Sequence, residues 1–325
     1  RIHVSRKGDF GAVRLQASDY GRDAFGQVVV ARDFGEALES RLSESRHLVR
    51  YRPARFVALE EAAGPLRSLR IRDEQGERVL GARLLVAADG TRSDMRQALG
   101  IGAIEHDYRQ TLFVARMRAE QAPDGTAYER FGEHGPTALL PRGDRHFGVV
   151  HGVQREQAEA VAALDDDAWI QRVQGEFGWR VGRLLVSGPR SAYPIVRVVA
   201  ERTFGERAVL LGNAAQTLHP IGAQGFNLGL RDALTLAELV GQADDPGAAA
   251  VLEAHARRRH EDRQRTLEFS DTLARLTGNA SPLLRPLRSL GLLAADNSAS
   301  LQSMLVGGAM GFRGDVPALC REVAR

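Results

Sequence analysis

Several features that mark other classes of protein are missing from this sequence. Cys320 is the only cysteine among 325 residues, which excludes an intramolecular disulfide and a metal site built from cysteines. No apolar run reaches the roughly 18 residues that a membrane-spanning helix needs. No Gly-x-Ser-x-Gly motif occurs, so a hydrolase of that kind has no candidate nucleophile. His134, His146 and His151 lack the spacing and carboxylate partners of a metal site, so we assign them to a sheet and expect no metal.

A nucleotide-binding fingerprint is also missing. No Gly-x-Gly-x-x-Gly follows a predicted strand, and Gly100-Ile101-Gly102 follows a helix and lacks the third glycine. We therefore expect a βαβ unit of about 30 residues or more to be absent from this chain. The first residue is Arg1, so the native start and any targeting peptide cannot be judged.

Charge and composition are those of a globular protein of two-domain size, with 43% hydrophobic and 26% charged residues and a net charge of +3. Basic residues cluster, as at Arg257–Arg259 and Arg263. Each cluster is best explained as a solvated helix face, and attraction to an anionic membrane or an acidic partner stays open. No basic stripe interleaved with aromatic residues is present, so we expect no nucleic-acid partner.

The most informative stretch is RAVLLGNAAQTLHPIGAQGFNLGLRD, residues 207–232. Residues 208–211 are apolar and end at Gly212, which predicts a buried strand that stops at a tight turn. A helix is predicted from Gly225, with Leu230, Leu234 and Ala237 on its apolar face and Gly241 at its end. A strand, a glycine loop and a helix N-terminus form an anion site, because glycines admit a ligand and free N–H groups face it. An ordinary βα turn explains the spacing equally well.

A second strand-and-turn stretch precedes it. Residues 84–88 predict a buried strand, and Asp89-Gly90-Thr91-Arg92-Ser93-Asp94-Met95-Arg96 follows at once. We expect Asp89 to accept a hydrogen bond from a ribose or a water, and Ser93 and Arg96 to start a helix that faces phosphates. The alternative is a helix N-cap with a surface arginine.

Further strands and helices are predicted along the whole chain. Strand signals occur at 2–4, 13–15, 49–51, 56–59, 66–71, 111–117, 127–131, 137–141 and 146–152, with a hairpin turn at 73–76. Residues 108–200 predict an antiparallel sheet. Helices are predicted at 32–42, after the acidic turn 165–167, and from Asp245-Pro246 to about Leu276. Residues 283–310 predict either an interfacial amphipathic segment or a packed C-terminal helix.

These motifs resemble a known family. GNAAQTLHPIGAQGFNLGLRD resembles the second FAD motif of the aromatic-ring hydroxylases typified by p-hydroxybenzoate hydroxylase, usually G-D-A-A-H…H-P…A-G-Q-G-x-N-x-G-x-x-D. Asn213 and Gln216 replace the usual Asp and His, as in the ubiquinone-biosynthesis branch. Gly222-Ala223 departs from the usual Ala-Gly. The D-G-x-x-S-x-x-R stretch, the block HVSRKGDFG near the start and Ser191-Ala192-Tyr193-Pro194 also match that branch.

The resemblance implies an α/β (α+β) fold of the p-hydroxybenzoate hydroxylase type, with a Rossmann-type FAD domain, an antiparallel substrate sheet and C-terminal helices. We expect an N-terminally incomplete FAD domain at 1–107, the substrate sheet at 108–200, a return segment at 201–241 and helices at 242–325. The resemblance implies a set of cofactor-binding residues, which are Gln27, Asp89, Gly90, Ser93, Arg96, Gly212, Asn213, Pro220, Gly225, Phe226 and Asn227. For Gln27, a surface position near a helix start stays open as the alternative. His219 and Tyr193 are only nearby candidates for catalysis.

The chemistry implied is that of a flavin monooxygenase. NAD(P)H reduces FAD, O₂ adds at the flavin C4a, and the hydroperoxide hydroxylates a prenylated phenol in ubiquinone biosynthesis. We expect a cytoplasmic protein, with peripheral contact at the inner face of a bacterial membrane and contact with other ubiquinone-biosynthesis proteins left open. Two alternatives also stay open: a hydroxylase of the same fold for another ring position or aromatic substrate, and a non-catalytic partner or fragment without an FAD site.

Overall fold

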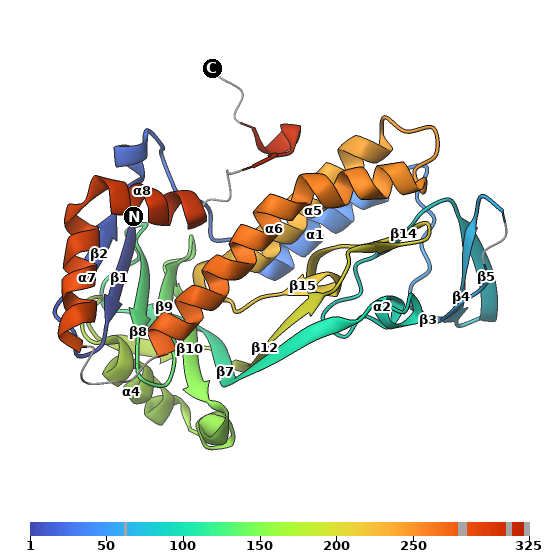
Figure 1. Cartoon of the computed structure of the whole chain (residues 1–325). Helices are drawn as coiled ribbons and strands as arrows, with labels where there is room; N and C mark the ends of the chain where they lie inside the picture. The colour runs from blue at the N-terminus through green and yellow to red at the C-terminus, as the bar shows by residue number, and fades with distance from the viewer. Residues whose placement is uncertain (62–63, 279–284, 310–313, 322–325) are drawn as a thin grey trace. The chain divides into compact units, whose positions relative to one another are not determined.

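The chain folds into two compact units, each built from several segments (Figure 1). The computed structural model describes residues 1–61, 64–278, 285–309 and 314–321. The sheet unit comprises residues 1–46, 108–195 and 273–306, and the parallel-strand unit comprises residues 47–107, 196–272 and 307–325. These units cut across the four segments that the sequence predicts, and each is described by itself.

A large, mainly antiparallel sheet forms the first unit. Its strands run in the order β12-β7-β10-β9-β8-β1-β2, and β11 also pairs with β7. The pair β1–β8 is parallel. The strands are β1 (Ile2–Arg6), β2 (Ala12–Leu15), β7 (Ala103–Ala119), β8 (Ala127–Phe131), β9 (Pro136–Pro141), β10 (Phe147–Gln154), β11 (Leu184–Ser187) and β12 (Ser191–Ala200). The predicted strands at 127–131, 137–141 and 146–152 are confirmed to within two residues.

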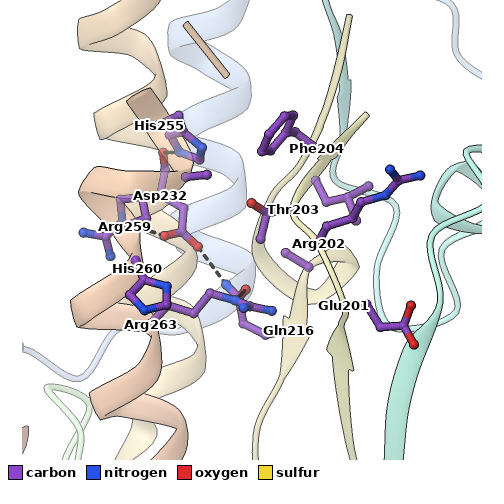
Figure 2. Close-up of a pocket in the computed structure, with 13 residues that line it drawn as sticks. Glu201, Arg202, Thr203, Phe204, Gln216, Asp232, His255, Arg259, His260 and Arg263 are labelled. Atoms are coloured by element: carbon purple, nitrogen blue, oxygen red, sulfur yellow. Dashed lines mark hydrogen bonds and ion pairs between the residues drawn. The ribbon is translucent and has the colours of Figure 1, made fainter. Parts of the chain in front are cut away.

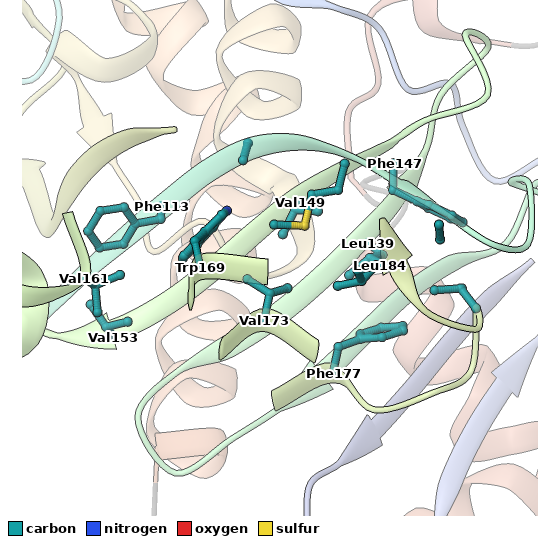
Figure 3. Close-up of a cluster of buried hydrophobic side chains, with 14 residues drawn as sticks. Phe113, Leu139, Phe147, Val149, Val153, Val161, Trp169, Val173, Phe177 and Leu184 are labelled. Atoms are coloured by element: carbon teal, nitrogen blue, oxygen red, sulfur yellow. The ribbon is translucent and has the colours of Figure 1, made fainter. Parts of the chain in front are cut away.

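One face of this sheet packs on α4 (Asp166–Phe177). The Asp165 side chain accepts from Ala168 N at 2.8 Å, which caps the helix as the acidic first turn predicts. Trp169, Val173 and Phe177 are at most 1% exposed and lie against the sheet (Figure 3). Burial of aromatic and branched side chains of this size stabilises by about 1.5–3 kcal/mol each.

The remaining helices of the sheet unit are α1 (Ala31–Ser43), α3 (Ala158–Ala162), α7 (Arg285–Asn297) and α8 (Ala299–Ala309). α1 confirms the predicted helix, although Phe34, Leu38 and Leu42 are exposed. Residues 285–297 and 299–309 are helical, and the predicted residues 283–284 and 310 lie outside the described residues. Among the described helices, none has the length and apolar character to cross a bilayer.

Two small sheets and the longest helices form the second unit. One sheet is the antiparallel meander β3 (Ala54–Leu59), β4 (Arg67–Asp73) and β5 (Gly76–Ala82), and the other has the order β13-β14-β6. The second sheet contains β6 (Leu85–Ala87), β13 (Phe204–Gly205) and β14 (Ala208–Leu210), while β15 (Gln216–Thr217) pairs with β12. The helices are α2 (Asp94–Ala98), α5 (Gln224–Val240) and α6 (Ala249–Gly278).

Four predictions about local structure are wrong. Residues 49–51 are not a strand, and Val86 in the predicted buried strand is 47% exposed. Helix α6 begins at Ala249 rather than at Pro246. Asp245 accepts from the Arg207 guanidinium at 3.0 Å and from Gly247 N at 3.2 Å, so it caps a turn that precedes α6 rather than the first turn of the helix.

The fourth error concerns the buried face of α5. The predicted stripe of Leu230, Leu234 and Ala237 is mostly exposed or half-buried. The buried side chains are instead Leu228, Arg231, Asp232, Thr235 and Leu236. The helix buries Arg231 and Asp232 because oppositely charged side chains lie beside them in the interior. A count of apolar residues along the sequence does not detect such partners.

Candidate functional site

Two loops meet at one edge of the parallel-strand unit. β6 and β14 run parallel with Leu85 opposite Ala208 and Ala87 opposite Leu210, so the turns that follow both strands lie at the same end. Asp89-Gly90 follows β6 and Gly212-Asn213 follows β14. Gly90 and Gly212 adopt left-handed φ values of 86° and 56°, which glycine reaches without steric cost. The carboxyl ends of parallel strands are where α/β proteins place their ligands.

Hydrogen bonds fasten these two loops to each other. Thr217 Oγ1 donates to Thr91 Oγ1 at 2.9 Å. The Arg96 guanidinium donates to Ala214 O at 2.9 Å and to Thr91 O at 3.1 Å, so one buried cation braces both loops. The loops therefore hold one another in a defined geometry.

Ser93 and Arg96, both predicted to face phosphates, lie buried at the start of α2. Ser93 is fully buried, and its Oγ accepts from Arg96 N at 2.9 Å as the N-cap of α2. Arg96 is 4% exposed and directs its guanidinium at backbone carbonyls. Both side chains therefore hold the two loops in place, and their contact with a cofactor remains a prediction.

Asp89 keeps free capacity as a hydrogen-bond acceptor. Its Oδ2 accepts from Met95 N at 3.0 Å, which fixes the side chain over the start of α2, and the residue is exposed. A carboxylate has two oxygens and about four lone-pair directions. Asp89 can therefore bind a ribose hydroxyl while it still caps the helix.

The N-terminus of α5 completes the site. Its N-cap Ala223 makes no side-chain hydrogen bond to the first turn, so no side-chain cap occupies the positive end of the helix dipole. A Cβ at Gly229 would lie 3.0 Å from the Gly212 Cα, so the helix packs tightly on the Gly212 loop. Space is open around Gly225, and Phe226 is 64% exposed. The predicted cofactor residues exposed on this unit are Asp89, Asn213, Pro220, Phe226 and Asn227.

The weak catalytic candidates have different positions. His219 is 2% exposed, its Nδ1 accepts from Ile221 N at 3.2 Å, and burial lowers its pKa to about 4. It therefore holds the loop as a neutral ring, and a proton-transfer role near pH 7 does not suit it. Tyr193 and Gln27 are exposed in the sheet unit, and their roles remain predictions.

A buried ionic network that was not predicted from the sequence includes Asp232, Arg259 and Gln216, which lie close together in Figure 2. Arg231 Nε donates to Asp262 Oδ2 at 2.7 Å, and Arg259 donates to both Asp262 and Asp232. The Gln216 amide donates to Asp232 Oδ2 at 2.7 Å and accepts from Arg263 Nε at 2.9 Å. Gln216 thus supplies one donor and one acceptor at a position where the resembled family has histidine. The sequence feature that could have revealed this network is a pair of opposite charges three residues apart on a helix, such as Arg259 and Asp262.

A pocket of about 200 Å³ lies beside this network, lined in part by Thr203, Phe204, His255 and Arg263. None of the predicted cofactor residues lines it. The pocket is small beside the 300–1,000 Å³ typical of cofactor sites. The loops and the α5 N-terminus, rather than this pocket, form the candidate site.

Two parallel strands that present braced glycine loops and an open helix N-terminus define a nucleotide-binding α/β protein with a separate large sheet. The chain belongs to the FAD binding domain family, whose model matches residues 24–270. Membership confirms the predicted FAD-dependent aromatic hydroxylase family, its fold class and its cofactor. The open α5 N-terminus and the space around Gly225 fit an anionic cofactor.

Known relatives agree with this assignment. The chain is 32% identical to "Ubiquinone hydroxylase UbiL" of Rhodospirillum rubrum over 88% of this chain and 67% of that protein. It is 33% identical to "Ubiquinone hydroxylase UbiM" of Neisseria meningitidis over 70% of this chain and 50% of that protein. The chain thus spans about half to two thirds of the length of these relatives. The fold matches p-nitrophenol 4-monooxygenase PnpA from Pseudomonas putida with a TM-score of 0.70 at 16% identity, covering 88% of this chain and 73% of that one.

The start of α5 carries a strained residue that is open to test. Ala223 has φ 52° and ψ 34°, a left-handed conformation that costs an alanine roughly 1–2 kcal/mol. We expect Ala223→Gly to raise the free energy of unfolding by about 0.5–1 kcal/mol, because relief of strain exceeds the added entropy of the unfolded chain. Gly222→Ala, at φ 75°, should lower it by a similar amount. Urea unfolding measures both.

A glycine in ordinary helical geometry serves as the control. Gly175→Ala in α4, where a Cβ meets nothing within 4 Å, should stabilise by about 0.5–1 kcal/mol. We expect Gly222→Ala to lower the free energy of unfolding and Gly175→Ala to raise it. A destabilising Ala223→Gly would show that the left-handed cap is not strained.

Proposed function

We propose that this chain provides the flavin loops and the substrate sheet of an FAD-dependent monooxygenase that hydroxylates a prenylated phenol in ubiquinone biosynthesis. The observation that carries the proposal is the convergence of the Asp89 loop, the Gly212 loop and the α5 N-terminus at one edge of the parallel-strand unit. The names of the relatives support the substrate class. The bound FAD, reduced by NAD(P)H, would activate O₂ and supply the oxygen atom.

The residues of the chain have separate tasks in this proposal. Asp89 binds ribose, and the N–H groups at Gly225–Asn227 face the negative charge that a reduced flavin carries. Exposed Pro220 and Phe226 supply apolar contact at the same edge. Arg96 and Ser93 keep the two loops in place. The apolar sheet of the other unit binds the prenylated ring and excludes water from it.

A charge placed at the α5 N-terminus tests the proposed site. Gly225→Asp adds a carboxylate in open space, where the helix dipole stabilises it, so the variant should fold. The same carboxylate repels an anionic cofactor, and we expect the affinity for FAD to fall by about tenfold or more, the loss of one charge-assisted contact. Absorbance titration of the chain with FAD measures binding.

Gly35→Asp is the matched control, because Gly35 is also a helical glycine whose Cβ position is open and it lies in α1. It should bind FAD like the wild type. Oxidation of NADH or NADPH with prenylated phenols then tests the reaction. A wild-type chain that binds no flavin under these conditions would refute the proposal for this chain and favour a non-catalytic partner or a fragment without an FAD site.

A further inference from the structure

The sheet face opposite α4 carries one carboxylic acid in an apolar row. The strand registers place Val4 beside Glu129, Glu129 beside Ala138, Ala138 beside Val150, and Val150 beside Val114. Val13 extends the row on β2. Directly paired residues of neighbouring strands point to the same face of a sheet. Glu129 is thus the only charged member of a row that crosses six strands.

The neighbours of Glu129 on β8 establish which face it occupies. Tyr128 stacks edge-on against Phe177 of α4, and Arg130 donates to Phe177 O at 2.8 Å. Successive residues of a strand alternate between faces. Glu129 therefore points away from α4 and from the sealed core of the sheet unit.

The surroundings of this carboxyl are unusual. Glu129 is half-buried and has no hydrogen bond or ion pair with any residue of the described structure. The charged group that shares its face on the next strand is Arg6, which is buried and paired with Asp9 at 3.8 Å. Burial among apolar neighbours raises the pKa of Glu129 to about 7. A half-buried carboxylate without a hydrogen-bond partner lowers the stability of the fold unless a bound ligand donates a hydrogen bond to it.

We propose that this row binds the ring of the phenolic substrate and that the Glu129 carboxylate accepts the hydrogen bond of its hydroxyl group. Val4 and Val150, which are half-buried, and Val114, which is exposed, remove the ring from water, and the Glu129 carboxylate orients it. The proton can pass from the phenol oxygen to a Glu129 oxygen, which leaves a phenolate and a neutral acid without any co-reactant. An electron-rich phenolate is the better acceptor of an electrophilic oxygen atom. This inference rests on the proposed function for its substrate class.

Binding of two matched probes to the whole chain tests the proposal without flavin chemistry. The probes are 2-prenylphenol and its methyl ether, which lacks the O–H donor. We expect the wild type to prefer the phenol by about tenfold or more at pH 8, since hydrogen bonds to charged groups are worth about 1.5–3 kcal/mol. The preference should fall towards pH 6, as the carboxylate gains its proton. Calorimetric titration measures both affinities.

Three variants make the result specific. Glu129→Leu, which has no hydrogen-bond acceptor, should bind both probes equally at every pH, whereas Glu129→Asp should retain the pH-dependent preference with weaker affinity. Glu133→Gln, an exposed glutamate beyond the end of β8, should behave as the wild type. Thermal unfolding confirms that each variant is folded.

The inference fails if Glu129→Leu keeps the preference for the phenol or if the wild type has none. Its failure is distinguishable from that of the proposed function. A chain that prefers the phenol through Glu129 but binds no FAD would retain the inference and refute the monooxygenase. A chain that oxidises NAD(P)H and hydroxylates phenols without any such preference would do the reverse.

Discussion

Asp232→Ala should lower the free energy of unfolding by about 3–5 kcal/mol, the usual cost of removing one partner from a buried ionic network. Asp232 is 4% exposed and accepts from Arg259 Nε and from the Gln216 amide, each at 2.7 Å. Its loss leaves Arg259 with Asp262 as its remaining carboxylate partner and leaves the Gln216 amide without an acceptor. Burial alone would lower the pKa of Arg259, and the two aspartates more than offset this effect, so the pKa is raised.

Two further variants separate charge from packing. Asp232→Asn keeps one acceptor oxygen and nearly the same volume, so it should lower the free energy of unfolding less than the alanine variant does. Glu253→Ala in α6 removes an exposed partner of Arg257 at 3.6 Å and should change stability by at most about 1 kcal/mol. Urea unfolding followed by circular dichroism gives the three values. Equal losses for Asp232→Ala and Glu253→Ala would show that the network contributes no special stability.

Acid should destabilise the fold through its buried histidines, and His151 gives the sharpest case. It is 2% exposed, its Nδ1 lies 2.9 Å from Thr137 Oγ1, and its Nε2 accepts from Arg172 Nε at 3.2 Å. The Arg172 contact requires an unprotonated Nε2. Burial, aided by the Arg172 charge, lowers the pKa of His151 to about 4, against about 6.5 in an unfolded chain.

The direction of the pH effect follows from these two values. Between pH 6.5 and 4 the unfolded chain binds a proton that the folded chain refuses, so stability falls as pH falls. The stabilisation is complete above about pH 6.5 and is lost by about pH 4, and its size is on the order of 3 kcal/mol for this residue. His219, whose pKa is also about 4, adds a similar contribution.

Unfolding by urea at pH 7, 6, 5 and 4 measures this dependence. We expect His151→Gln to be less stable than the wild type at pH 7 but to lose less stability on acidification. His47→Gln, a change at an exposed position, should leave the slope as it is in the wild type. Parallel curves for the wild type and His151→Gln would contradict the assignment of acid sensitivity to this ring.

Local signals in the sequence predicted much of this fold. The hairpin turn at 73–76 is confirmed by the pairing of Asp73 with Gly76, and α5 ends at Gly241 as predicted. Glycine turns, acidic caps and alternating strands are encoded within a few residues, so they can be read without knowledge of the fold. The two glycine loops were also found this way, although their binding roles remain proposals.

Local residue patterns predicted most of the strands and helices, the loops of the candidate site and the family of the chain, but not the start of α6 or the buried face of α5. Only the tertiary structure decided that Arg96 braces two loops, that α5 turns Asp232 inward, and that Glu129 stands without a partner in an apolar row. The physical reason is that a charged side chain is stable in the interior only where a distant partner meets it. Such partners lie up to 118 residues apart, as Arg96 and Ala214 do, and chain folding alone brings them together.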